Sequence, residues 1–412
     1  MTKNLWRLLA AVLTLSLIAA ACGDDDDDAG ASDSASASAS ASASDSASAS
    51  ASEMAEEDDM SDSASASEMA EEDEMAEEEA ASDVPADWPE SITFGFVPSQ
   101  DQAELQDDIQ PFIDVLEGAL GIEVEGVVTT DYTGLVTSMG TDQTDLGAFG
   151  PFGYTLGKDQ FGNIEPLIQS IRFGSATYHG QWYTNDPSVC EEGTLQPGTA
   201  LINDGGEIRQ VGALEAVALQ VGVFFGDDGK QFGETNDAGE EISQGSSCIG
   251  DLSSVAGSTI AFTSESSTSG YLFPALQLTE MGIDPTSDIT PVFTGGHDAA
   301  VTAVYNGDAT FGLSFDDARR NIRDEQTDVG EQVIVFNITE EIPNDVVAVR
   351  SELPDSLKDA IYTAVEEFLA TEDGAAIFDE IYGWTDIRPA VEEDFDVVRE
   401  AAAALGISEP PG

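Results

Sequence analysis

The chain has 412 residues and carries 81 acidic against 13 basic side chains, a formal net charge of −68. A chain with this charge repels nucleic acids and anionic membrane surfaces, so neither is expected as a partner. Its length is sufficient for more than one folded domain.

The N-terminus has the pattern of a targeting segment. Lys3 and Arg7 flank the start of an apolar run, residues 8–21, which is too short to remain comfortably as a membrane-spanning helix. The run ends in A-A-A-C-G and resembles a bacterial lipoprotein signal, which predicts removal of residues 1–21 and lipidation of Cys22. A plain secretory signal cleaved nearby is the alternative. We expect the mature protein outside the cytoplasmic membrane, anchored to it by the lipid.

Residues 22–87 have the composition of a disordered stalk. They contain D-D-D-D-D, an alternating Ser-Ala tract and the block S-E-M-A-E-E-D twice, with no Lys or Arg. Such a segment cannot bury enough apolar surface to offset the entropy lost on ordering, and its like charges keep it extended. Weak, unspecific cation binding by the acidic runs is the alternative function.

From residue 88 onward, predicted strands and helices alternate. The first strands are expected at residues 92–97, 123–129 and 145–149, and the helices between them at residues 104–116 and 132–139. This alternation predicts an α/β fold with a mainly parallel sheet, in which ligands bind beyond the carboxyl ends of the strands.

A less regular segment, residues 186–250, is rich in glycine and acids and contains Cys190 and Cys248 near its ends. Two cysteines in an exported chain most simply form a disulfide. A loop of this length would then be stabilised by about 4 kcal/mol in the chain-entropy view. A metal site or a redox pair is the alternative, but the sequence offers no further ligands nearby.

Residues 259–281 combine a predicted strand, a hydroxyl-rich turn and a predicted helix. The turn contains Ser264, Ser266, Ser267, Thr268 and Ser269. The first backbone N–H groups of a helix lack internal partners and lie at its positive end, so this arrangement can bind an oxyanion. An ordinary helix N-cap is the alternative. Further strands are expected at residues 287–294, 310–314 and 332–336, and further helices at 357–370 and 395–404.

Seven short motifs in a fixed order carry a family resemblance. They are F-G-F-V-P-S-Q (94–100), T-D-Y-T-G (130–134), D-L-G-A-F-G-P-F-G-Y (145–154), S-S-T-S-G-Y (266–271), G-G-H-D-A-A-V-T-A-V-Y-N-G-D-A (295–309), I-P-N-D-V-V-A-V-R (342–350) and G-W-T-D-I-R-P (383–389). The set resembles the phosphate/phosphite/phosphonate-binding branch of the periplasmic substrate-binding proteins, which feed ABC importers. The resemblance covers nearly all of residues 92–407 except the segment bounded by the cysteines.

The resemblance implies a type II periplasmic-binding-protein fold, with two α/β lobes, two crossing strands and the ligand in the cleft between the lobes. Lobe one would comprise residues 88–181 and 344–412, and lobe two residues 182–343 with the insert. The crossings would fall near residues 178–184 and 337–347. The resemblance also implies a monomer without a cofactor, whose partners are a small oxyanion and the permease of an ABC transporter.

Five ligand contacts carry over directly from the resemblance. Ser267, Thr268 and Ser269 would be the main oxyanion-binding group, and Tyr132 would donate its hydroxyl from the opposite lobe. Gln100 follows the first strand and would reach the ligand. For Tyr132, a partly buried aromatic residue at a helix start is the alternative.

Two further contacts follow strands in the second lobe. His297 stands at a strand-to-helix turn, where the resemblance places a ligand-facing histidine; a plain helix cap is the alternative. Asp316 matches an acidic position and would accept an O–H hydrogen bond from a protonated ligand or contact an amino group. Asp317 is the competing candidate, because the register is uncertain by one residue.

Four residues are expected at the edges of the site. Phe149 stands where relatives have a tyrosine and cannot donate a hydrogen bond, which transfers that contact to the backbone near Gly150. Tyr178 and His179 lie where the chain leaves the first lobe, although His179 is equally explained as a strand histidine bound to a carbonyl. None of the expected contacts is Lys or Arg. Phe149 and Asp316 together favour phosphite or methylphosphonate.

Three other functions are alternatives to the capture of a phosphorus oxyanion for import. The same fold can bind another small solute, or serve a sensor that does not transport. A secreted hydrolase would require a catalytic motif, but the sequence contains no G-x-S-x-G, no H-E-x-x-H and no glycine-rich phosphate loop with lysine. Ser267 and His297 are better explained as hydrogen-bond donors than as a nucleophile and its base, so no enzyme activity is expected.

Overall fold

A computed structural model describes residues 84–219, 235–236 and 238–408, all within the compact unit 77–412. The predicted signal segment, Cys22 and nearly all of the acidic stalk lie outside the described residues. In the described part of the chain, no helix is both long enough and apolar enough to cross a membrane.

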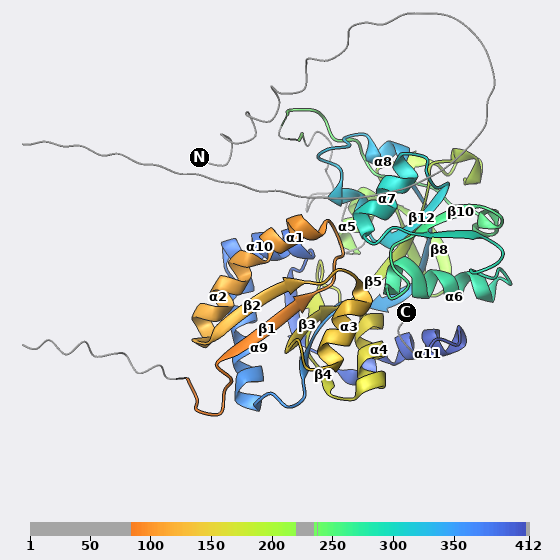
Figure 1. Ribbon diagram of the computed structural model, residues 1–412. Helices are drawn as coiled ribbons and strands as arrows, with labels where there is room; N and C mark the ends of the chain where they lie inside the picture. The colour runs from red at the N-terminus through yellow and green to blue at the C-terminus, as the bar shows by residue number, and fades with distance from the viewer. Residues whose placement is uncertain (1–83, 220–234, 237, 409–412) are drawn as a thin grey trace, which may run out of the picture. The chain divides into compact units, whose positions relative to one another are not determined.

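The first lobe is built on a six-stranded sheet with the order β15-β4-β14-β3-β1-β2 (Figure 1). Its strands are β1 Ser91–Phe96, β2 Glu123–Val128, β3 Leu146–Phe149, β4 Ile164–Ile171, β14 Val346–Arg350 and β15 Asp386–Pro389. β1 pairs in parallel with β2 and β3, whereas β14 is antiparallel to β3 and β4. The sheet is therefore mixed rather than mainly parallel.

Among the described residues, seven α-helices belong to this lobe. They are α1 Gln102–Asp108, α2 Gln110–Leu120, α3 Tyr132–Gly140, α4 Pro151–Phe161, α9 Asp355–Leu369, α10 Glu372–Ile381 and α11 Asp396–Ala404. In α2, Phe112, Ile113, Leu116 and Leu120 are buried at helical spacing. The single helix expected at 104–116 is divided into α1 and α2, because Pro111 has no N–H and disfavours a helix that continues through it.

The second lobe is built on a seven-stranded mixed sheet with the order β11-β10-β12-β5-β13-β9-β6. Its strands are β5 Thr177–Thr184, β6 Gln196–Pro197, β9 Ser246–Ser247, β10 Thr259–Phe262, β11 Thr290–Phe293, β12 Phe311–Phe315 and β13 Ile334–Pro343. Its longer helices are α6 Phe273–Glu280 and α7 His297–Tyr305, with the short α8 at Val329–Gln332. Trp182, Phe262, Leu278, Phe311 and Phe336 form part of its core. The strand expected at 287–294 begins only at Thr290.

The chain passes between the two sheets twice, at adjacent places. It leaves the first sheet after β4 and returns after β13, and β5 and β13 form an antiparallel pair. The backbone N–H of Asn344 donates to the Ala176 carbonyl at 2.8 Å, and its Nδ2 donates to the Ser175 carbonyl at 2.8 Å. Because all of β5 belongs to the second sheet, we propose the first lobe boundary within residues 172–176 rather than after residue 181.

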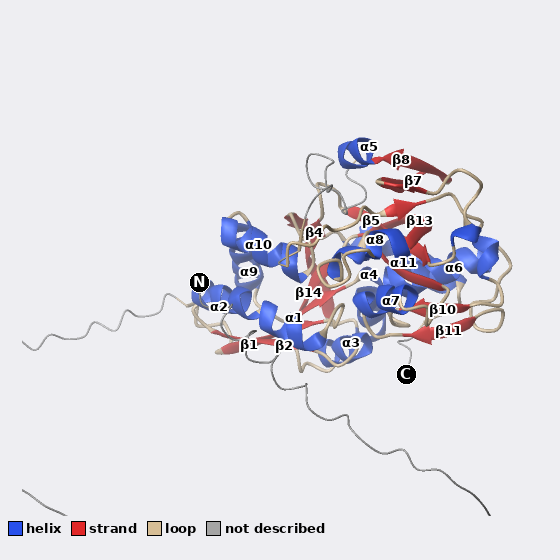
Figure 2. Ribbon diagram, turned by 90° about the horizontal axis from the view of Figure 1, so that it is seen from above, coloured by secondary structure: helices blue, strands red, loops and turns tan. Residues whose placement is uncertain are grey.

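The segment between the cysteines extends one margin of the second lobe. It contains the hairpin of β7 Thr199–Asp204 and β8 Glu207–Gly212, followed by α5 Ala213–Ala218, which Figure 2 shows grouped beside β5 and β13. Cys190 and Cys248 form the predicted disulfide, with their Cα atoms 5.6 Å apart. The two cysteines that the disulfide joins are separated by 58 positions in the sequence.

We expect Cys190→Ser to lower the free energy of unfolding by up to about 4 kcal/mol, because the unfolded chain regains the freedom that the cross-link removes. Urea unfolding with and without reductant measures the effect. The Cys190→Ser/Cys248→Ser double variant should be insensitive to reductant and as stable as the reduced wild type. Equal stability of oxidised and reduced wild type would contradict the expectation.

Candidate functional site

One cavity lies between the two lobes and is lined by both. It encloses about 690 Å³ of empty space, part of it continuous with solvent. We call it the interlobe cavity. Its lining residues are Val97, Ser99, Gln100, Tyr132, Ala148, Phe149, Gly150, Arg172, Tyr178, Ser267, Thr268, Ser269, His297, Phe315, Arg320, Asn321, Asp345, Asp379, Glu380, Ile381 and Tyr382.

The hydroxyl-rich turn after β10 forms one wall of this cavity. The helix begins with a π-helical turn, Thr268–Leu272, which continues into α6. A Cβ atom at Gly270 would lie 1.8 Å from Oγ1 of Thr263, so only glycine allows the turn to pack this closely on the end of β10. The predicted strand, turn and helix are therefore present.

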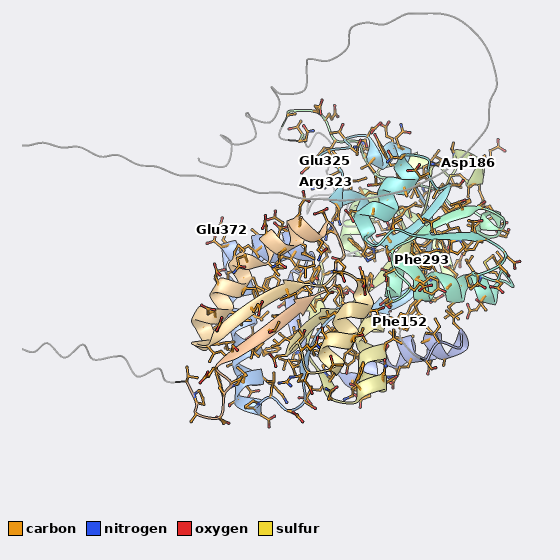
Figure 3. All side chains as sticks on the ribbon, viewed as in Figure 1. Phe152, Asp186, Phe293, Arg323, Glu325 and Glu372 are labelled. Atoms are coloured by element: carbon orange, nitrogen blue, oxygen red, sulfur yellow. A yellow bond between two sulfur atoms is a disulfide. The ribbon has the colours of Figure 1, made fainter. Side chains whose placement is uncertain are left out.

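Of the three turn residues expected to contact the ligand, Ser267, Thr268 and Ser269, the first two have a hydroxyl that already accepts a hydrogen bond from a backbone N–H. Oγ of Ser267 accepts from Gly270 at 3.1 Å, and Oγ1 of Thr268 accepts from Phe152 at 2.9 Å. Phe152, labelled in Figure 3, is the second residue of α4 in the first lobe, so the second bond also joins the lobes. A hydroxyl that accepts in this way keeps its own proton to donate. The N–H groups of the first helical turn add further donors.

Tyr132 contributes a buried hydroxyl from the first lobe. It is the first residue of α3, whose N-cap Asp131 accepts the Gly134 N–H at 2.7 Å. The Tyr132 side chain is 4 % exposed, and its hydroxyl has no hydrogen-bond partner among the described residues. Burial raises the pKa of Tyr132 well above its ordinary value, so the phenol keeps its proton and can donate it.

His297 begins α7, and its backbone N–H donates to the Ser99 carbonyl of the first lobe at 2.8 Å. Its ring Nδ1 lies 2.7 Å from Oγ of Ser314. Burial lowers the pKa of His297 to about 3, so the ring is neutral at physiological pH. If Ser314 donates to Nδ1, the proton of the neutral ring is on Nε2, which then is a donor.

Two arginines line the same cavity, although none of the ligand contacts expected from the sequence is Lys or Arg. Arg172 follows β4, and its Nη2 lies 2.5 Å from Oδ2 of Asp345. Arg320 comes from a short helical turn, Ala318–Asn321, in the second lobe, and its Nη1 lies 4.0 Å from Oδ1 of Asp379 at the end of α10. The cavity therefore contains two of the 13 basic residues of a strongly acidic chain.

Carboxylates accompany the arginines. Asp345, Asp379 and Glu380 line the cavity, and burial raises the pKa of Asp345 while its partner Arg172 opposes that shift. Asp345 belongs to the motif I-P-N-D-V-V, which is part of one of the seven motifs that carry the family resemblance. That membership is a sequence signal that could have identified Asp345 as a site residue. Arg172 and Arg320 belong to no such motif.

Nine of the residues named from the sequence come together in the interlobe cavity. Beyond those described above, Gln100, Phe149, Gly150 and Tyr178 line it as well. Gln100 donates from Nε2 to the Glu380 carbonyl at 3.4 Å, and Phe149 is 1 % exposed.

Three of the expected residues lie elsewhere. His179 and Asp316 line a second, adjacent cavity, where burial lowers the pKa of His179 to about 4 and raises that of Asp316 to about 7. Asp317 is buried in a two-pronged ion pair with Arg319, with Nε to Oδ1 at 2.9 Å and Nη2 to Oδ2 at 2.5 Å. The residue after β12 therefore does not face the interlobe cavity in either register.

The chemistry of the interlobe cavity is that of hydrogen-bond donation to an anion. Within the described ranges, no group of three His, Cys, Asp or Glu side chains is placed to hold a metal ion. The neutral hydroxyls, the neutral histidine and Arg172 all line this cavity, and a hydrogen bond to an anion is stronger in partly buried surroundings than in water.

The similarities to known proteins agree with this chemistry. The phosphate-import protein PhnD of Mycolicibacterium smegmatis is 26% identical over 344 residues, which cover 79% of this chain and 89% of the relative. The phosphonates-binding periplasmic protein of Escherichia coli is 19% identical over 313 residues, 76% of each chain.

Solved structures show the same two-lobed fold. A binding protein component of an ABC phosphonate transporter from Pseudomonas aeruginosa has a TM-score of 0.56 at 16% identity, over 76% of this chain and 85% of that one. PhnD1 of Prochlorococcus marinus, solved with methylphosphonate, has a TM-score of 0.56 at 17% identity, over 77% of this chain and 98% of that one.

The family described as "ABC transporter, phosphonate, periplasmic substrate-binding protein" matches residues 94–395. This range runs from β1 in the first lobe to the last turn before α11, and so includes both sheets and every segment that lines the interlobe cavity. The chain therefore belongs to the family of periplasmic substrate-binding proteins of phosphonate ABC transporters.

Proposed function

We propose that this protein is a lipid-anchored, extracytoplasmic binding protein that captures a phosphorus oxyanion in the interlobe cavity and delivers it to an ABC importer. Members of the family bind a small ligand and interact with the permease of their transporter, and they are transport components rather than enzymes. The proposal adds the lipid anchor on Cys22 and the binding of the ligand by the residues described above.

The unpartnered hydroxyl of Tyr132 is the observation that carries the proposal. A buried hydroxyl without a hydrogen bond costs about 1–3 kcal/mol, so its retention in this cavity is explained by a ligand that completes the bond. Ser267 and Thr268 face the same space from the opposite lobe with protons to donate. An anion between them would be bound from both sides, as a closing two-lobed protein requires.

The properties of the cavity support a small tetrahedral ligand. The relatives are named for phosphate import and phosphonate binding, and one related structure holds methylphosphonate. Phe149 lines the cavity and offers an apolar surface to a methyl group or a hydrogen on phosphorus. The second reason to favour phosphite or methylphosphonate, a contact with Asp316, loses its basis because Asp316 lies in the adjacent cavity.

Isothermal titration calorimetry of the purified protein with phosphate, phosphite, methylphosphonate and 2-aminoethylphosphonate tests the proposal. Binding of at least one of them with a Kd of about 1 μM or below, roughly −8 kcal/mol, is the expected result. If a folded protein binds none of the four, the cavity takes another solute and the proposal fails. A neighbouring permease and ATPase that import the bound ligand would separate transport from sensing.

We expect Tyr132→Phe to weaken binding of the tightest of these ligands by about tenfold or more, because one buried hydrogen bond to an anion is lost. The free energy of unfolding should stay the same or rise, since the hydroxyl bonds nothing among the described residues. Calorimetry and urea unfolding measure the two effects. Loss of stability with unchanged affinity would show that the hydroxyl has a structural role.

We expect Cys22→Ser to abolish membrane anchoring, because only a cysteine can receive the lipid at that position. Fractionation of cells of the native host, followed by immunoblotting of membrane and soluble fractions, measures the change. Wild-type protein in the soluble fraction would indicate the plain secretory signal instead. Cys190→Ser is the matched control, because it also removes a cysteine but leaves position 22 intact.

A further inference from the structure

Arg172 lines the interlobe cavity, although the family resemblance did not predict it as a site residue. The described residues engage two of its five N–H groups: Nε donates to the Tyr382 carbonyl at 2.9 Å, and Nη2 donates to Oδ2 of Asp345 at 2.5 Å. Its side chain is only 13 % exposed and lines the interlobe cavity. A nearly buried guanidinium whose remaining N–H groups bond nothing among the described residues can donate them to the oxygen atoms of a bound anion.

Two aromatic rings hold this guanidinium in place. Its Cζ lies 5.6 Å from the ring centroid of Tyr178 and 5.7 Å from that of Phe315. Both rings belong to the second lobe, whereas Arg172 and its partner carbonyl at Tyr382 belong to the first. The donors of Arg172 are therefore fixed in direction before a ligand arrives, which lowers the entropic cost of binding.

Asp345 presents an acceptor beside these donors. Its Oδ2 bonds Arg172, while a Cβ atom at Gly150 would lie 4.0 Å from its Oδ1 and 3.4 Å from Oγ1 of Thr268. The carboxylate and the Thr268 hydroxyl thus both lie close to Gly150 in the lining of the interlobe cavity. Arg172 and Asp345 together give this lining a donor and an acceptor that are in contact with each other.

We propose that Arg172 and Asp345 select phosphorus oxyanions that carry a P–O–H group. Arg172 donates to an ionised oxygen of the ligand, and Asp345 accepts a hydrogen bond from the protonated oxygen on the same phosphorus atom. A ligand without that proton places a bare oxyanion against the carboxylate, which repels it and leaves a buried acceptor unpaired. This inference rests on the proposed function and narrows its substrate class.

The ligands themselves make the inference testable. Phosphate retains one P–O–H throughout the neutral and mildly alkaline range, whereas phosphite and methylphosphonate lose theirs in their second ionisation near neutral pH. A change in the protonation of the protein affects the binding of phosphate and of the ligand compared with it. The pH dependence of the ratio of their Kd values therefore reports the ionisation of the ligands themselves. The titratable and charged groups around the pair are Tyr132, Tyr178, His297, Asp316, Arg320, Asp379, Glu380 and Tyr382.

Burial raises the pKa of Asp316 to about 7, within the pH range of the experiment. Asp316→Asn therefore serves as one control, and it should leave the pH dependence of the ratio unchanged. Asp145→Asn serves as another: Asp145 bonds Arg350 at 2.9 Å with side chains 20 % and 21 % exposed, in the same lobe but outside the cavity lining.

The experiment measures Kd values for phosphate, phosphite and methylphosphonate by calorimetry at about pH 6 and about pH 8.5, on each side of the ligands' second ionisation. In the wild type and in both controls, the methylphosphonate-to-phosphate Kd ratio should rise by more than about tenfold with pH. Asp345→Asn should flatten the rise, because its amide can also donate to a bare oxyanion. Arg172→Lys should raise the Kd of all three ligands by about tenfold or more, because a single ammonium group cannot reproduce the fixed fork of guanidinium donors.

Circular dichroism and thermal melting of every variant establish that it is folded before its affinities are compared. A wild-type ratio that does not change with pH, or an Asp345→Asn variant that keeps the rise, would overturn the inference while leaving oxyanion binding intact. Unchanged affinity in a folded Arg172→Lys variant would also overturn the inference. The Arg172–Asp345 ion pair would then have the structural role of linking the two chain crossings. Failure of every ligand to bind wild type at either pH would instead overturn the proposed function.

Discussion

Binding an anion away from water requires donors whose protons are not already committed, and the start of the helical segment 268–280 meets this requirement. Ser267 and Thr268 receive a backbone N–H on their oxygen atoms, so their own protons remain available for donation. The Thr268 bond comes from the other lobe, so this donor is also part of the contact between the lobes. The close packing of Gly270 on Thr263 holds the turn against the strand end. Most other features of the site are placed around this turn.

Sequence reasoning succeeded where the signal is local. Alternating apolar strands and helices predicted the α/β layers, two cysteines predicted their disulfide, and a hydroxyl-rich turn between β10 and α6 predicted one wall of the cavity. It failed where side-chain direction decides. Asp316 directly follows a strand that ends at the cavity, yet it lines the neighbouring cavity, and nothing in the order of residues reveals that difference. The split of one expected helix at Pro111 was visible in the sequence but was not used.

Arg172 and Arg320 show a second limit of the sequence. Arg172 lies in the connection after β4 and Arg320 in a short helical turn, and each meets its carboxylate partner through a contact that spans more than 50 residues. Burial of the Arg172–Asp345 pair, whose side chains are 13 % and 16 % exposed, costs free energy that a well-packed apolar pair would not. In a chain with 81 acidic and 13 basic residues, two arginines in one cavity place positive charge beside its three carboxylates. The net charge of the whole chain therefore does not reveal that its binding site contains cations.

The adjacency of the two chain crossings has a mechanical consequence. Asn344 bonds the carbonyls of Ser175 and Ala176, so the outgoing and returning strands form one short ribbon rather than two separate tethers. A ribbon bends readily about a single axis and resists sliding and twisting. The lobes can therefore separate only as whole bodies about that axis, and every contact that spans the cavity must break in the same movement. Escape of a bound solute would then be an all-or-none event, with its rate set by the rigid rotation of a lobe rather than by the fluctuation of any one loop.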